Sequence, residues 1–166
     1  MASVTIARSL AEHLRAARLP EDLRGKRDER LFQIWLAGVI GEWAGAQSAP
    51  LIVKAEAQGG GVRPVEILGT GFWPDIAIGT SNQPTKLAVE VKCLTRRNRA
   101  SHTSQPIGQA LMYREMYEEC VVVLVLVEDI GRPVALPEGL SNKLLSDRIE
   151  LVWIDASGDT IGATDV

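Results

Sequence analysis

The chain has 166 residues, which is enough for one domain that buries a core without disulfides or a structural metal. Hydrophobic residues make up 46% of it, which excludes an intrinsically disordered chain. The formal net charge of −3 argues against strong non-specific affinity for nucleic acid, although it leaves room for a local basic groove.

Cysteine usage and hydropathy restrict the class further. Cys93 and Cys120 have no zinc-ligand spacing, so we expect no zinc site and a reducing, cytoplasmic compartment. The apolar run at residues 121–127 is far too short to span a bilayer, so we expect no membrane partner. The sequence therefore predicts one domain over residues 1–166.

Two helices are predicted in the first third of the chain. Residues 3–19 have an amphipathic pattern that ends at Pro20. Residues 27–44 give the clearest helix, because apolar residues recur at i, i+3, i+4 and i+7. At about 100° per residue, Glu29 lies near the edge of this apolar stripe and Glu42 lies further from it. The stripe consists of Phe32, Trp35, Leu36, Val39, Ile40 and Trp43.

Two short strands are predicted next, at residues 51–58 and 65–68, and they are joined by a glycine-rich turn. The turn matches none of the phosphate-binding loop patterns, which disfavours an α/β nucleotide-binding protein. The second strand leads towards Trp73, which we expect to be a packing residue, with base stacking as the alternative.

Residues 73–92 predict two further strands around a turn at Asn82-Gln83. Successive side chains of a strand point to opposite faces, so Glu90 and Lys92 share one face. A turn at that position pairs residues whose numbers sum to about 165, which sets Asp75 opposite Glu90. Two carboxylates and an ammonium group then converge on one patch.

This patch suits a hard divalent cation such as Mg²⁺, which prefers oxygen ligands. A bound cation of this kind acidifies water and neutralises charge on a phosphate, and a lysine beside it can orient the attacking water. The alternative is a surface hairpin in which Lys92 forms a cross-strand ion pair with a carboxylate.

A basic loop and a second long helix are predicted after Lys92. Arg96, Arg97 and Arg99 are placed to contact a nucleic-acid backbone, although a solvated charge run has the same composition. Residues 104–120 predict a helix with Ser104 as its N-cap and a proline in its first turn. Gln109 and Tyr113 share one face of this helix; without a function they would be an exposed amide and a half-buried ring.

The remaining chain predicts a central strand at residues 120–129, because its β-branched residues run unbroken. A loop at 131–139, a helix at 141–148, a final strand at 149–156 and a loosely ordered tail at 156–166 follow. The predicted fold class is α/β, with a mixed central sheet flanked by helices.

The string Pro74-Asp75, fourteen residues, then Glu90-Val91-Lys92 resembles the PD-(D/E)XK nuclease superfamily. The predicted element order over about residues 27–155 resembles its αβββαβ core with one extra αβ unit. The resemblance implies a restriction-endonuclease-like fold in which Asp75 and Glu90 bind Mg²⁺ or Mn²⁺. It also implies the Val91 carbonyl as a further ligand and Lys92 as a catalytic residue.

Two helices extend this resemblance. Members of the superfamily often carry another acidic residue on the first core helix, for which Glu29 is the candidate and Glu42 the runner-up. Gln109-x-x-x-Tyr113 is similar to the helix of RecB-like and lambda-exonuclease-like members. There the glutamine approaches the active site, and the tyrosine supports it or contacts DNA.

The resemblance thus implies a metal-dependent nuclease that hydrolyses DNA, in defence, repair or recombination, as a homodimer or within a larger complex. The alternative is a nuclease fold that has lost its chemistry and binds nucleic acid or acts as a scaffold. The sequence does not separate endonuclease from exonuclease, nor linear DNA from branched, single-stranded or RNA substrates.

Overall fold

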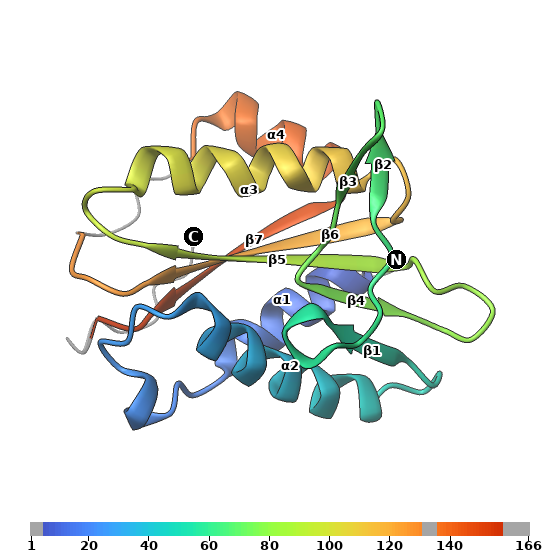
Figure 1. Cartoon of the computed structure of the whole chain (residues 1–166), viewed down its shortest axis with the longest axis horizontal. Coiled ribbons are helices and arrows are strands. Elements are labelled where there is room, and N and C mark those ends of the chain that lie inside the picture. The colour runs from blue at the N-terminus through green and yellow to red at the C-terminus, as the bar shows by residue number, and fades with distance from the viewer. Residues whose placement is uncertain (1–4, 131–135, 158–166) are drawn as a thin grey trace.

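The computed structural model describes residues 5–130 and 136–157. A five-stranded sheet lies between two layers of helices, with α1 and α2 on one face and α3 and α4 on the other (Figure 1). The helices are α1 (Ile6–Ala16), α2 (Glu29–Gly45), α3 (Arg99–Tyr113) and α4 (Glu138–Ser146), with 3-10 turns at Glu21–Leu23 and Glu56–Gln58. The sheet has the order β1 (Ile52–Ala55), β4 (Ile76–Gly79), β5 (Leu87–Leu94), β6 (Glu119–Leu126) and β7 (Ile149–Asp155).

The sheet is mixed, as the sequence predicted. Strands β1, β4 and β5 pair antiparallel, whereas β5, β6 and β7 pair parallel. Ile76 lies opposite Val89 and Ile78 opposite Leu87, so paired residue numbers in β4 and β5 sum to 165. The register predicted from the turn is therefore confirmed. It places the residue before β4, Asp75, beside Glu90.

The alternation along β5 divides its side chains between two cores. Leu87, Val89 and Val91 pack towards α1 and α2, whereas Ala88 and Leu94 pack towards α3 and α4. Every residue of β6 is buried, which confirms the prediction of a central strand covered on both faces. Glu90 belongs to the α3 face, where its charge must be satisfied inside the protein.

The prediction for α3 was wrong at both ends. The helix begins five residues earlier than predicted and ends at Tyr113, so Pro106 lies in its interior and Arg99 belongs to the helix. Ser104 is not the N-cap, since its hydroxyl donates to carbonyls of the preceding turn. Asn98 precedes the helix, and its side chain bonds the Thr95 N–H. A proline inside a helix removes one hydrogen bond and crowds the carbonyl four residues before it, but Pro106 is buried, so its packing offsets part of that cost.

The segment before Trp73 also differs from the prediction. Strand β2 (Val65–Ile67) pairs with β3 (Thr70–Phe72) in a separate hairpin, and the sheet strand starts only at Ile76. Leu68 and Gly69 turn the hairpin with φ of 51° and 77°. The remaining elements lie within a few residues of their predicted ranges. Residues 131–135 of the loop predicted at 131–139 lie outside the described residues, as do residues 158–166 of the predicted tail and residues 1–4. The end of that predicted loop is helical, since α4 begins at Glu138.

Candidate functional site

The candidate site lies beside Asp75, just before β4 begins, where β5 continues past its pairing with β4. The Val91 N–H donates to Asp75 Oδ2 over 2.7 Å, and the Cys93 N–H donates to Glu29 Oε2 over 3.1 Å. Alternate residues of a strand direct their N–H groups to the same edge. Without the two carboxylates, these N–H groups would need a neighbouring strand to accept their hydrogen bonds. Two carboxylates, one from the start of β4 and one from α2, take the place of that strand.

The Val91 carbonyl lies at the same edge. In an extended strand, the N–H and C=O of one residue point to the same side, and the Val91 N–H points to Asp75. The register that pairs Ile76 with Val89 would pair Val91 with Pro74. Proline has no N–H to donate. Position 74 therefore offers this carbonyl no ladder hydrogen bond, which suits it to act as a metal ligand.

Glu90 is only 3% exposed and is held from α3. Its Oε2 atom accepts a hydrogen bond of 2.8 Å from the Tyr113 hydroxyl, which also lies 2.9 Å from the Trp73 carbonyl. Tyr113 has no exposed surface. Of the two roles expected for this tyrosine, the structure favours support of the carboxylate, because a buried ring cannot reach DNA.

Lys92 joins two of the acidic groups. Its Nζ atom lies 2.9 Å from Glu29 Oε1 and 3.3 Å from Glu90 Oε1, and its side chain is 15% exposed. The alternative of a surface hairpin ion pair is therefore wrong in one respect, because the pair is largely buried. A largely buried lysine keeps its charge only when carboxylates pair with it.

Helix α2 contributes two side chains to the site. Glu29 lies in its first turn and contacts Lys92, whereas the runner-up, Glu42, is exposed near the other end. Gln33 was not predicted. Its Nε2 atom donates to Asp75 Oδ1 over 2.7 Å. The signal that would have found it is its position one turn after Glu29, on the same face of the helix.

The site has an excess of negative charge. Three carboxylates, of Asp75, Glu90 and Glu29, surround the one ammonium group of Lys92. Burial, and then the nearby charge of Glu90, raise the pKa of Asp75 to about 7. Burial likewise raises the pKa of Glu90, against the effects of Lys92 and Tyr113. For Lys92, burial would lower the pKa, but the carboxylates, Glu90 foremost, outweigh it and raise the pKa.

Gln109 lies one helical turn before Tyr113 on α3. Its Oε1 atom is buried and has no hydrogen-bond partner. A buried acceptor without a donor costs free energy, and such groups commonly bond to an ordered water or a ligand. Gln109 therefore remains a candidate site residue, because its buried Oε1 atom can accept a hydrogen bond from a water or a ligand.

The oxygen atoms of this site are candidate ligands for a divalent cation. Within residues 5–130 and 136–157, no group of three or more His, Cys, Asp or Glu side chains is arranged to hold a metal ion. Mg²⁺, however, is usually held by one or two carboxylates together with waters and substrate phosphates. Asp75, Glu90 and the Val91 carbonyl supply oxygen donors of that kind, and their negative charge is not neutralised by Lys92 alone. These residues fit Mg²⁺ or Mn²⁺.

No protein-family model, curated protein or solved structure matches this chain. Its likeness to the PD-(D/E)XK motif therefore rests on the residues themselves, above all Asp75, Glu90 and Lys92. Among the described residues, no helix has the length and apolar character needed to cross a membrane.

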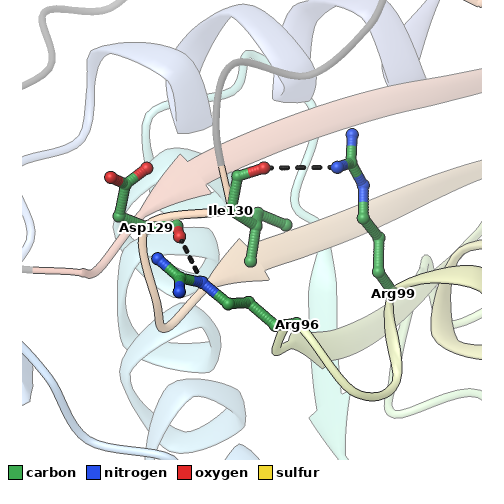
Figure 2. Close-up of a pocket in the computed structure, with 4 residues that line it drawn as sticks. All are labelled: Arg96, Arg99, Asp129 and Ile130. Atoms are coloured by element: carbon green, nitrogen blue, oxygen red, sulfur yellow. Dashed lines mark hydrogen bonds between the residues drawn. The ribbon is translucent and has the colours of Figure 1, made fainter.

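The arginines of the predicted basic loop differ in their contacts, and Figure 2 shows those of Arg96 and Arg99. Arg96 Nε donates to the Asp129 carbonyl over 3.1 Å, and the Arg99 guanidinium donates to the Ile130 carbonyl over 3.2 Å. These residues line a cavity of about 420 Å³ at the end of the sheet. All three arginines are exposed. Arg96 and Arg99 thus brace the loop after β6 with part of their donors, whereas Arg97 faces solvent.

Proposed function

We propose that the chain is a metal-dependent nuclease that hydrolyses DNA phosphodiester bonds with Mg²⁺ or Mn²⁺. The observation that carries this proposal is the meeting of Asp75, Glu90 and Lys92 beside the start of β4, in buried surroundings and with excess negative charge. Two carboxylates held by main-chain and side-chain donors form a rigid arrangement, which a purely structural ion pair does not need.

The chain order supports a restriction-endonuclease-like fold. Helix α2, strands β1, β4 and β5, helix α3 and strand β6 follow the order αβββαβ, and α4 with β7 adds one αβ unit. The β2–β3 hairpin is an insertion before the strand that carries Asp75. The buried free thiols of Cys93 and Cys120 agree with a reducing cytoplasmic compartment.

In this proposal, Asp75, Glu90 and the Val91 carbonyl hold the metal. When bound, a divalent ion lowers the pKa of water and offsets negative charge on the phosphate. Gln33 and the Val91 N–H fix the Asp75 carboxylate. Tyr113 fixes Glu90 in the same way.

Lys92 supplies the remaining positive charge. Its ammonium group has three donors, of which Glu29 and Glu90 occupy two. The third can orient the attacking water or donate to a phosphate oxygen as charge develops on it. Glu29 holds Lys92 in place from α2. A second copy of the chain or a larger complex would contribute to substrate selection.

The test is cleavage by the purified chain with Mg²⁺ or Mn²⁺ of supercoiled, linear, single-stranded and four-way-junction DNA. Asp75→Ala should abolish cleavage and Mn²⁺ binding measured by calorimetry, whereas Glu42→Ala, an exposed carboxylate on α2, should change neither. Mn²⁺ binding that persists in Asp75→Ala would place the metal elsewhere. A wild-type protein that cuts none of these substrates would favour the scaffold alternative.

A further inference from the structure

Trp73 is the feature of the structure that the proposed chemistry leaves unused. It lies between β3 and Asp75, and it is 49% exposed although it is one of the largest apolar side chains in the protein. The β2–β3 hairpin that precedes it projects beyond the sheet beside α3 (Figure 1). The expectation that Trp73 is a packing residue therefore accounts for only part of its surface.

The indole ring is held in a defined position. A Cβ atom at Gly71 would lie 2.6 Å from the ring carbon Cη2 of Trp73, so the ring rests directly against the Gly71 backbone. A larger residue at position 71 would displace the ring from this place. The main chain of Trp73 is fixed as well, since its carbonyl lies 2.9 Å from the Tyr113 hydroxyl. A ring fixed in this way presents its exposed surface with little loss of entropy on binding.

The main chain of Trp73 is adjacent to the carboxylates. The Tyr113 hydroxyl that contacts the Trp73 carbonyl also contacts Glu90, at 2.8 Å. Asp75 follows Trp73 by two residues. A polynucleotide whose phosphate lies at Asp75 and Glu90 would therefore bring a neighbouring base to Trp73.

We infer that Trp73 is a stacking platform for an unpaired base of the substrate, so that the site takes single strands or frayed ends in preference to continuous duplex. Aromatic side chains stack on every base, whereas a base inside a duplex is already covered by its neighbours. This inference rests on the proposed function for the place of the phosphate. It deepens that proposal by naming the class of DNA.

Binding of a fluorescently labelled single-stranded oligonucleotide, followed by anisotropy with Ca²⁺ in place of Mg²⁺ so that the carboxylates keep a cation, tests the platform by affinity and not by cleavage. Trp73→Leu keeps an apolar side chain but removes the aromatic ring, and it should weaken binding by about fivefold to a hundredfold. Trp73→Phe should retain most of the affinity. Leu68→Ala is the matched control, because Leu68 is fully exposed at the tip of the same hairpin; it should bind like wild type.

The results separate this inference from the proposed function. Equal affinity of Trp73→Leu and wild type, equal losses in Trp73→Phe and Trp73→Leu, or no binding by wild type would overturn the platform. Tighter binding of a fully paired duplex than of the single strand would also overturn it. A ring-dependent affinity in a protein that cleaves no DNA would leave the platform standing and remove the nuclease. Cleavage at an unchanged rate in Trp73→Leu would support the nuclease and remove the platform.

Discussion

The side-chain amide of Gln33 donates a hydrogen bond to Asp75 Oδ1 over 2.7 Å. Glu29, one helical turn earlier on α2, pairs with the ammonium group of Lys92. A single face of α2 therefore fixes both the carboxylate and the lysine of the candidate site. Asp75 and Lys92 come from two different strands, so the helix sets their separation as much as the sheet does. This relationship gives the first prediction.

Gln33→Ala removes one of the two donors to the buried Asp75 carboxylate. Hydrogen bonds to charged groups contribute about 1.5–3 kcal/mol, so the free energy of unfolding should fall by that order at pH 8.5. At pH 5.5 the loss should be smaller, because Asp75, with its pKa raised to about 7, is then protonated and accepts a weaker bond.

Urea denaturation at the two pH values measures this difference. Gln47→Ala is the control, since Gln47 lies just beyond the same helix and donates only to the Trp43 carbonyl. Its effect should be the same at both pH values. A pH-independent loss in Gln33→Ala would contradict the assigned contact.

The second prediction concerns the pH dependence of stability. Burial and the charge of Glu90 raise the pKa of Asp75 from 3.8 to about 7 in the folded protein. Between these values the folded state keeps a proton that the unfolded chain has lost, so stability falls as pH rises from about 4 to 7. One group contributes at most about 1.4 kcal/mol per pH unit to this slope. Above the folded pKa its effect is constant.

Asp75→Asn should reduce this slope, because the amide does not titrate in the range. Urea unfolding at half-unit pH intervals measures the slope, and Asp22→Asn, at an exposed aspartate, is the matched control. Mg²⁺ or Mn²⁺ should restore stability above pH 7 by binding the ionised carboxylates. Identical slopes in Asp75→Asn and wild type would contradict the burial of an uncompensated charge.

The pairing of Asp75 with Glu90 was predictable because it depends on local features, the alternation along two strands and the position of the turn between them. Gln33 was missed because its contact joins residues 42 apart in sequence, and the only local signal for it was its position one turn after Glu29. The braces from Arg96 and Arg99 were missed for the same reason, since their acceptors are main-chain carbonyls after β6. Trp73 was assigned to packing because hydrophobicity alone does not report exposure.

The third prediction separates the arginines of the basic loop. Arg97 is exposed, so its removal should leave stability unchanged. If it contacts a phosphate, Arg97→Ala should flatten the log–log salt dependence of DNA binding by about one unit. Arg96→Ala should instead lower stability by about 1 kcal/mol through loss of its bond to the Asp129 carbonyl. An unchanged salt slope in Arg97→Ala would make this position a solvated charge.

The last prediction concerns Lys92 and decides between a catalytic and a structural role for this lysine. An exposed ion pair contributes under about 1 kcal/mol, but the Lys92 side chain is only 15% exposed and its partner Glu90 only 3%. Removing one member of a buried pair typically costs about 3–5 kcal/mol. Lys92→Met, which keeps the apolar stem, should therefore cost about 3 kcal/mol at neutral pH, less where Glu90 takes up a proton.

Saturating Mn²⁺ should recover part of that stability, because the metal replaces the lost positive charge. Single-turnover cleavage, measured under conditions where circular dichroism shows both proteins folded, then isolates the chemical role. If Lys92 acts on the water or the phosphate in the transition state, Lys92→Met should be slower by about a hundredfold or more even with the metal bound. Equal single-turnover rates would reduce Lys92 to a structural partner of Glu29 and Glu90. The metal and its carboxylates would then carry the reaction without it.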